Sequence, residues 1–442
     1  MDGEFEQPGP SYWDIADVEY LERYQEGGFH PVHIGDELHH GRYKIVHKLG
    51  YGSFSTVWLV QDRHKDQYVA LKIAAADAGR ERTEIHMLQR LGLLRDSVGG
   101  GSGHPGRNFV SEMLDEFEIQ GPNGKHQCIA LEPLGASLSI AYENLEGYRL
   151  PSEVSKKVAM QLAEGLSYLH ACGIVHGGRL SSDPIPLAIP DLKPETLTRK
   201  IDLHDGNILF RLPSVRHWTA EQVYSCFGRP EVIQISRRDG LPLGPHAPKY
   251  AVCLPPPKKL LSLCLTDASI SIVDFGESFL STICIPKQLP TPTWFAAPEV
   301  LFHDLVGPPS DVWALACLLF HVFGRRELFQ SYNGNRDEIL LEMVCTFGKL
   351  PSRWWQQWEK RKDYFGEDGI ANPGNRRTSG VDLQAKLKSL TRDAIGGLEA
   401  EELAAFECVL LGMLTFEPSK RLSAEGVVQI LPRVCGIGSS PM

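Results

Sequence analysis

The stretch ISIVDFG, residues 270–276, decides the fold of this chain. Its alternating β-branched residues predict a short buried strand, and this strand ends at Asp274, which is followed by Phe275 and Gly276. A second motif, Ala-Pro-Glu at residues 297–299, follows after 20 intervening residues. A single Asp-Phe-Gly occurs often by chance. The meaning of the pair therefore depends on the motifs that precede it along the chain.

The composition of the chain is that of an ordinary soluble globular protein. Its 442 residues can bury one large core or two modest ones, and 42% of them are hydrophobic and 23% charged. The net charge of −10 argues against a nucleic-acid-binding protein and favours basic partners. Ten cysteines without a CxxC pair predict free thiols in a reducing compartment. No signal peptide is expected, and the longest apolar run, residues 312–324, is too short to span a membrane.

Hydrophobic periodicity predicts a β-rich N-terminal part and a larger helical part, which is an α+β fold. Strands are predicted over residues 43–60 (two strands joined by a turn), 67–73, 108–118 and 128–132. Helices are predicted over 80–91, 152–170, 312–323, 338–347 and 400–414, with Ser152 as a candidate N-cap.

Two proline-rich stretches, Gly178–Ile201 and Arg211–Leu265, fit neither pattern, and loops of this length are usually functional or disordered. Residues 1–40 also lack periodicity and are expected to form an irregular arm. The predicted division is this arm, an N-terminal lobe at 41–134, a C-terminal lobe at 135–434 that carries insertions at 178–201 and 211–265, and a tail at 435–442.

A glycine-rich turn lies at Leu49–Val57, with the sequence LGYGSFSTV. Glycines allow the backbone of such a turn to approach phosphates closely, and the amides of the turn can donate hydrogen bonds to them. Val57 would then cover an adenine ring. Taken alone, an ordinary glycine-rich hairpin is an equally good interpretation.

The next strand, Val69–Lys72, ends in one lysine, which suits a cation held against the α- and β-phosphates of a nucleotide. Glu84 on the following predicted helix could orient Lys72 through an ion pair, and Glu81, one turn earlier, is the competing candidate. The alternative is a surface lysine, which is common on strands.

Residues 202–210, with the sequence DLHDGNILF, match an Asp-x4-Asn motif followed by an apolar strand. Asp202 would accept or orient a substrate hydroxyl, and Asn207 would bind magnesium together with Asp274. A polar turn before a strand is the simpler interpretation of this segment alone. Further along, Glu299 is expected to pair with Arg421, and Asp311 is expected to brace the loop that carries Asp202.

These motifs, in this order, resemble those of eukaryotic-type protein kinases over roughly residues 41–434. The local sequences at 50–59, 130–135 and 274–279, together with the long spacer between Asn207 and Asp274, resemble those of the SR-protein-specific kinases and their fungal relatives. The resemblance implies a two-lobed kinase fold that uses ATP and Mg²⁺ and phosphorylates serine or threonine in basic, Ser/Arg-type proteins.

The resemblance also assigns roles to individual residues. Asp202, Lys72 and Glu84 would be catalytic, and Asn207 and Asp274 would hold Mg²⁺. Nucleotide contacts would come from Leu49, Gly50, Gly52, Ser53, Val57, Ala70, Lys72, Glu132 and Leu134.

The pattern is interrupted where His176-Gly177 should run directly into Asp202. Removal of Gly178–Ile201 would give a seamless catalytic loop, so one hypothesis is a retained intron or an error in the gene prediction. The rival is a genuine insertion that bulges from the surface. Within this segment Asp191–Thr196, DLKPET, imitates a catalytic loop but lacks the preceding histidine and the magnesium-binding asparagine.

Three functions remain open from the sequence: an active serine/threonine kinase, a catalytically inactive kinase-fold scaffold or mis-spliced isoform, and a small-molecule kinase of the aminoglycoside type. The expected partner is a basic or Ser/Arg-rich protein substrate, with no direct nucleic acid and no membrane. We expect a monomer in the cytoplasm, the nucleus or both.

Overall fold

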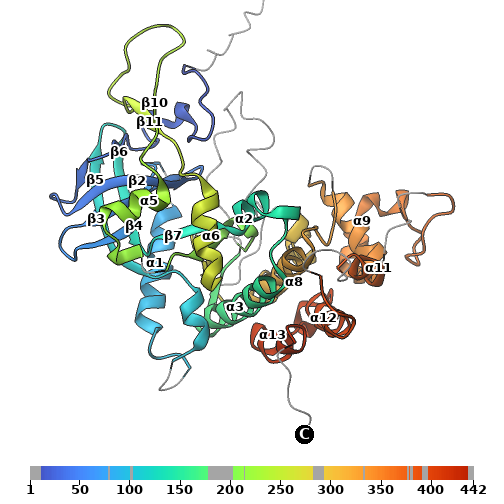
Figure 1. Ribbon diagram of the computed structural model, residues 1–442. Helices are drawn as coiled ribbons and strands as arrows, with labels where there is room; N and C mark the ends of the chain where they lie inside the picture. The colour runs from blue at the N-terminus through green and yellow to red at the C-terminus, as the bar shows by residue number, and fades with distance from the viewer. Residues whose placement is uncertain are drawn as a thin grey trace, which may run out of the picture.

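The computed structural model describes residues 11–77, 80–99, 103–177, 203–213, 215–281, 293–331, 334–375, 378, 382–390 and 397–436. They form two lobes, a sheet-containing N-terminal lobe and a helical C-terminal lobe (Figure 1). This is the α+β, two-lobed architecture that the sequence predicted. Among the described helices, none is both long enough and apolar enough to cross a membrane.

The N-terminal lobe is built on an antiparallel sheet with the strand order β1-β2-β3-β4-β6-β5. The strands are β1 (Glu37–Leu38), β2 (Tyr43–Tyr51), β3 (Ser55–Asp62), β4 (Gln67–Ala74), β5 (Met113–Gly121) and β6 (Gly124–Leu131). Because side chains alternate between faces, Leu71 and Ile73 lie in one apolar cluster, while Leu59 and Ile129 join another with Leu88 of α1 (Arg80–Leu94). The sheet is therefore buried on both faces.

The C-terminal lobe is organised around α3 (Ser152–Ala171) and α8 (Pro308–Gly324). Every residue of α8 from Ser310 to Gly324 is buried, as expected for a helix that is apolar on all sides. The other helices are α2 (Leu138–Asn144), α6 (Pro257–Asp267), α7 (Pro298–Leu301), α9 (Arg336–Phe347), α10 (Ser352–Gln357), α11 (Leu383–Lys388), α12 (Ala400–Met413) and α13 (Ala424–Ile430). Short strands β7 (Leu134–Ser137), β8 (Ile174–Val175), β9 (Ile208–Arg211), β12 (Ile270–Ile272) and β13 (Phe279–Leu280) frame the region between the lobes.

Two local predictions were wrong. Helix α3 begins at Ser152 itself and its N-cap residue is Pro151, so the Ser152 side chain lies in the first turn and caps nothing. The strand predicted from residue 108 begins only at Met113. Residues 105–109 form a 3₁₀ turn instead, because Pro105 fixes the backbone and the His104 side chain accepts a hydrogen bond from the Gly106 amide.

The spacer at 211–265, which fitted no element in the sequence, contains two helices and a two-stranded hairpin. They are α5 (Ala220–Phe227), β10 (Val232–Gln234), β11 (Tyr250–Val252) and α6. Figure 1 shows β10 and β11 beside the blue N-terminal arm, at the top of the N-terminal lobe. The arm and the hairpin share an apolar cluster made of Tyr12, Val18, Leu21, Tyr24, Phe29, Ala75, Ile235 and Ala251. The arm is irregular, as predicted, but it is packed.

Several histidines are buried in both lobes, and this predicts that the protein is sensitive to acid. Burial lowers the pKa of His30 to about 4, and it also lowers the pKa values of His126, His176 and His321. In the unfolded chain these histidines regain a pKa of about 6.5, so below that pH they bind protons more readily than in the folded protein. Above that pH the neutral histidines cost the folded state no stability. As the pH drops, the free energy of unfolding falls, by about 1 kcal/mol per buried histidine at pH 5.5.

Thermal unfolding at pH 7.5 and 5.5 measures this loss. The buried Nδ1 atom of His30 has no hydrogen-bond partner among the described residues, so a His30→Asn variant should show a smaller difference between the two pH values. Identical melting temperatures of the parent protein at both pH values would contradict the prediction.

Candidate active site

The glycine-rich hairpin between β2 and β3 leaves open space above its tip. Gly50 is paired with Val57, and the Gly52 amide donates to the Ser55 carbonyl at 2.8 Å. A Cβ added at Gly50 or Gly52 would meet no atom within 4 Å, so neither glycine is required by packing inside the protein. Ser53 at the tip is exposed. These features fit a loop that approaches a phosphate chain.

Strand pairing places Val57, Ala70 and Lys72 on one face of the sheet. Val57 is directly opposite Lys72, and Ala70 is opposite Leu59, whose side chain lies in the core that the two lobes share. Cross-strand neighbours of this kind project to the same side. The hydrophobic residues predicted to contact an adenine ring therefore stand beside the predicted phosphate-binding lysine.

Lys72 is the centre of an ion-pair group that joins three separate elements. Its Nζ atom lies 2.6 Å from Glu84 Oε2 on α1 and 3.4 Å from Asp274 Oδ1 after β12. The Glu84 side chain is only 4% exposed, and burial raises the pKa of its carboxyl while the charge of Lys72 opposes that rise. Glu84 thus occupies the orienting position. The side chain of the competing candidate, Glu81, lies outside the described residues.

The base of the catalytic loop is held by Asp311 of α8. Its Oδ2 accepts a hydrogen bond from the His176 amide at 2.8 Å, and its Oδ1 accepts one from the Gly177 amide at 3.0 Å. The His176 ring is fully buried and meets the Phe275 ring edge-on, with 5.2 Å between the ring centres. Burial lowers the pKa of His176, so this imidazole is neutral at pH 7 and serves as packing. Asp311 occupies the bracing position that the sequence predicted.

Asp202 and the inserted segment 178–201, including Asp191, lie outside the described residues. The residues on both sides are packed: His176 precedes the segment, and Leu203, which follows it, is completely buried. His204 caps the next turn, since its Nδ1 accepts a hydrogen bond from the Gly206 amide at 2.9 Å.

Asn207 and Asp274 are brought together by the pairing of β9 with β12. Ile208 is opposite Ile272, and the Val273 amide donates to the Asn207 carbonyl at 3.0 Å. Asp274 adopts a left-handed backbone conformation with φ of 64°, and its side chain is 42% exposed. Amide and carboxylate oxygens of this kind fit Mg²⁺, which prefers oxygen ligands and would neutralise phosphate charge here.

The segment that connects the lobes shows contacts that the sequence analysis missed. The Glu132 carboxylate is paired with Arg211, and Arg216 Nε lies 3.9 Å from it. Leu134 lies in β7, opposite Arg211 of β9. The Glu132 side chain is therefore engaged by arginines, and its nucleotide contact stays a prediction. The pairing could not be predicted because Arg211 lies at the start of the unassigned spacer.

The N-terminal arm supplies a second contact that the sequence did not indicate. Lys48, two residues before Gly50, is 0% exposed, and its Nζ is paired with the Glu19 carboxylate, which also accepts a hydrogen bond from the Tyr24 hydroxyl. The same ammonium group lies 5.4 Å from the centres of the Tyr51 and Trp58 rings. The arm therefore fastens the base of the glycine-rich hairpin.

Loosening this fastening is expected to weaken ATP binding. A Glu19→Gln substitution removes the charge partner of a buried lysine, and the hairpin above it should lose its fixed position. We expect the KM for ATP to rise about threefold to tenfold, with kcat nearly unchanged. Steady-state kinetics with varied ATP measures both constants. The exposed Glu26 on the same arm provides the control substitution Glu26→Gln, and a Glu19→Gln enzyme with the parent KM would contradict the role.

The C-terminal lobe contains the predicted pair between Glu299 and Arg421. Two parallel contacts join them, Nη1 to Oε1 at 2.5 Å and Nη2 to Oε2 at 2.7 Å, and the Ser310 hydroxyl donates to the same carboxylate at 2.8 Å. The arginine and glutamate side chains are 0% and 1% exposed. This pair ties α7, which begins at Pro298 of the Ala-Pro-Glu motif, to the segment before α13, and Ser310 ties it to the start of α8.

Comparison with known proteins agrees with this geometry. The protein kinase domain family matches residues 43–177 and 261–431. A serine/threonine protein kinase of Aspergillus fumigatus is 28% identical over 413 residues, which are 92% of this chain and 88% of that protein. The serine/threonine-protein kinase SRPK of Physarum polycephalum is 29% identical over 425 residues, 92% of this chain and 89% of that one. Human SRSF protein kinase 3 is 38% identical over 187 residues, 42% of this chain and 30% of that protein.

The family match leaves out residues 178–260, which contain the inserted segment and most of the spacer. On both sides of this gap, it covers the glycine-rich hairpin, Lys72, Glu84, Asp274 and the pair between Glu299 and Arg421. The chain belongs to the protein kinase domain family, and it is a protein serine/threonine kinase similar to the SRPK-type members.

Proposed function

We propose that this kinase transfers the γ-phosphoryl group of ATP to serine or threonine in basic, Ser/Arg-type protein substrates. The observation that supports transfer is the group formed by Lys72, Glu84 and Asp274, because an active kinase needs the lysine–glutamate ion pair and the metal-binding aspartate in place together. The substrate class is supported by the similarity to SRPK-type kinases and by the net charge of −10.

In the proposed reaction, the glycine-rich hairpin and Lys72 hold the phosphate chain, and Glu84 keeps the lysine pointed at it. Asn207 and Asp274 would hold the Mg²⁺ ions that offset the phosphate charge. The substrate hydroxyl oxygen forms a bond to the γ-phosphorus, the bond from that phosphorus to the bridging oxygen of ADP breaks, and the hydroxyl proton passes to the carboxylate expected of Asp202. His204 stands where related kinases carry a lysine that helps to neutralise the γ-phosphate, so we expect a slow turnover.

The test is Mg²⁺-dependent transfer of labelled phosphate to a Ser/Arg-repeat peptide. The full chain is compared with a chain that lacks Gly178–Ile201, and a small-alcohol panel tests the small-molecule kinase alternative. Activity of both chains supports the proposal for the sequence as written. Activity of the shortened chain alone assigns the full chain to an inactive isoform. If neither chain transfers phosphate to peptide, the proposal fails and the scaffold function takes its place.

Gly177 stands where related kinases carry an arginine that would pair with an activation-segment phosphate. A Cβ at this position would lie 3.1 Å from Asp311 Oδ1, so a side chain here would require Asp311 to shift slightly. We expect full activity without phosphorylation of the activation segment. Treatment with a protein phosphatase followed by its removal should leave the rate unchanged, and a loss of most of the activity would contradict this expectation.

We also propose that the kinase is a monomer that resides in the cytoplasm, the nucleus or both and binds neither membranes nor nucleic acid directly. Sedimentation analysis tests the oligomeric state. Imaging of a fluorescent fusion tests the location, and either a stable dimer or a membrane-bound fusion would overturn the corresponding part.

A further inference from the structure

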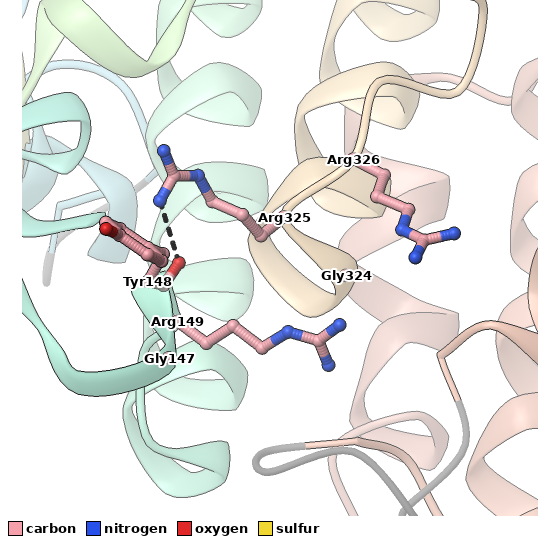
Figure 2. Close-up of a pocket in the computed structure, with 6 residues that line it drawn as sticks. All are labelled: Gly147, Tyr148, Arg149, Gly324, Arg325 and Arg326. Carbon is pink, nitrogen blue, oxygen red and sulfur yellow. Dashed lines mark hydrogen bonds between the residues drawn. The ribbon is translucent and has the colours of Figure 1, made fainter. Parts of the chain in front are cut away.

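Three arginines from two separate segments line one open pocket in the C-terminal lobe. Arg149 follows the 3₁₀ turn at Glu146–Tyr148, and Arg325 and Arg326 follow α8 directly. The pocket has a volume of about 410 Å³, and its other lining residues are Gly147, Tyr148 and Gly324 (Figure 2). Such a concentration of positive charge is unexpected in a chain with a net charge of −10.

Arg325 builds the pocket by joining its two sides. Its Nη1 donates to the Tyr148 carbonyl at 3.0 Å, and its guanidinium lies 5.1 Å from the centre of the Tyr142 ring and 5.4 Å from that of Tyr148. Both Arg325 and Tyr148 adopt left-handed backbone conformations, with φ of 52° and 56°. Non-glycine residues keep this conformation only where surrounding contacts hold it. The contacts of Arg325 therefore hold the backbone on the two sides of the pocket together.

Arg149 and Arg326 are available to a ligand. Neither forms an ion pair with any residue that the structure describes, and among the same residues the buried Arg149 Nη1 atom has no hydrogen-bond partner. A buried guanidinium nitrogen left unpaired costs free energy, which a suitable acceptor would recover. Figure 2 shows the Arg149 and Arg326 side chains extending toward the same side of the pocket, while Arg325 points toward Tyr148.

The pocket is separate from the nucleotide site. The Tyr142 ring below Arg325 meets the His321 ring at 5.1 Å, and His321 Nε2 lies 3.9 Å from Asp205 Oδ2, which follows His204. The buried rings of Tyr142 and His321 therefore separate the pocket from the catalytic loop. None of its lining residues belongs to the glycine-rich hairpin or to the group around Lys72.

We propose that Arg149 and Arg326, positioned by Arg325, bind a phosphoryl group. The planar guanidinium has paired donors that match the oxygens of a phosphate, and two such groups on one pocket suit a dianion better than a single carboxylate. The pocket volume exceeds that of a phosphate ion, so it can also admit the side chain of a phosphorylated residue. The ligand can be inorganic phosphate or a phosphoserine on a polypeptide. This inference does not depend on the substrate proposed above.

The test is isothermal titration calorimetry at low salt on the full chain, saturated with Mg²⁺ and a non-hydrolysable ATP analogue so that the nucleotide site is filled. The probes are inorganic phosphate, a capped Gly-phosphoserine-Gly peptide and the same peptide without phosphate. The variants are Arg149→Ala/Arg326→Ala and Arg149→Lys/Arg326→Lys. Exposed Arg229 and Arg433 supply the matched control, Arg229→Ala/Arg433→Ala, which also removes two charges.

We expect the parent and the control to bind a phosphate-bearing probe and to ignore the unphosphorylated peptide. The alanine variant should bind the probe at least about tenfold more weakly than the parent. The affinity of the lysine variant should lie between the two, because lysine keeps the positive charge but lacks the paired N–H donors of the guanidinium. Tighter binding of the peptide identifies a phosphorylated polypeptide as the source, and equal binding identifies the free ion. Undetectable binding to the parent, or equal affinity in all variants, overturns the site. If the alanine variant fails to fold, the affinity of the lysine variant replaces it in the test, and an affinity equal to that of the parent overturns the site.

Discussion

Replacing Lys72 by methionine is expected to reduce phosphoryl transfer by about 10²–10³-fold or more. Lys72 contacts both Glu84 and Asp274, and it would place a positive charge against the phosphate chain. Methionine matches its length and apolar stem but carries no charge. The substitution therefore removes the electrostatic contribution and leaves the packing of β4 nearly unchanged.

Incorporation of labelled phosphate into a Ser/Arg-repeat peptide measures this loss. Lys125 on β6 of the same sheet provides the control Lys125→Met, because its side chain is 70% exposed and pairs only with Glu118 among the described residues. A second variant, Glu84→Gln, should lose less activity than Lys72→Met, since it misplaces the lysine without removing it. Parent-like rates in the Lys72→Met protein would show that the phosphate is held elsewhere.

Replacing Arg421 by methionine is expected to destabilise the protein by about 3–5 kcal/mol. The substitution leaves the Glu299 carboxylate buried without its partner. It also removes the donor to three carbonyls, those of Thr415 at 2.8 Å, Pro309 at 3.0 Å and Phe416 at 3.1 Å. The guanidinium further lies 5.0 Å from the centre of the Trp313 ring, so packing is lost as well.

Urea unfolding followed by tryptophan fluorescence measures this change. The control is Arg353→Met, which breaks the more exposed pair with Glu417 and should cost at most about 1 kcal/mol. A Glu299→Leu/Arg421→Met double variant should recover part of the loss, because it removes the unpaired charge. Equal unfolding midpoints for Arg421→Met and the parent would contradict the structural role of the pair.

The sequence was sufficient for the parts of the site that consist of local motifs. Lys72 follows an alternating strand, Glu84 falls on the next helix, and Asp274 ends a β-branched run, so each could be assigned from its neighbours along the chain. The pair between Glu299 and Arg421 could be predicted only because the family resemblance relates these distant motifs.

The sequence was insufficient where unrelated segments meet. The salt bridge between Glu19 and Lys48 joins an arm without periodicity to a strand, and nothing in either segment marks a buried charge. The same holds for Glu132 with Arg211. In the spacer, α5 and β10 are too short to produce a periodic signal, although Thr219 and Gln222 form a capping box at the start of α5. Pairing across long separations, rather than local preference, decides these contacts.

The packing of the N-terminal arm against the β10–β11 hairpin has a consequence for synthesis on the ribosome. Tyr24 and Ala251 share one apolar cluster, although more than 200 residues separate them in the chain. At translation rates of about 5–20 residues per second, the arm waits on the order of ten seconds or more for its partner to emerge. During that interval, Tyr12, Leu21 and Phe29 are available to chaperones. The arm thus precedes the N-terminal sheet in the chain but can complete its packing only after β10 and β11 have been made.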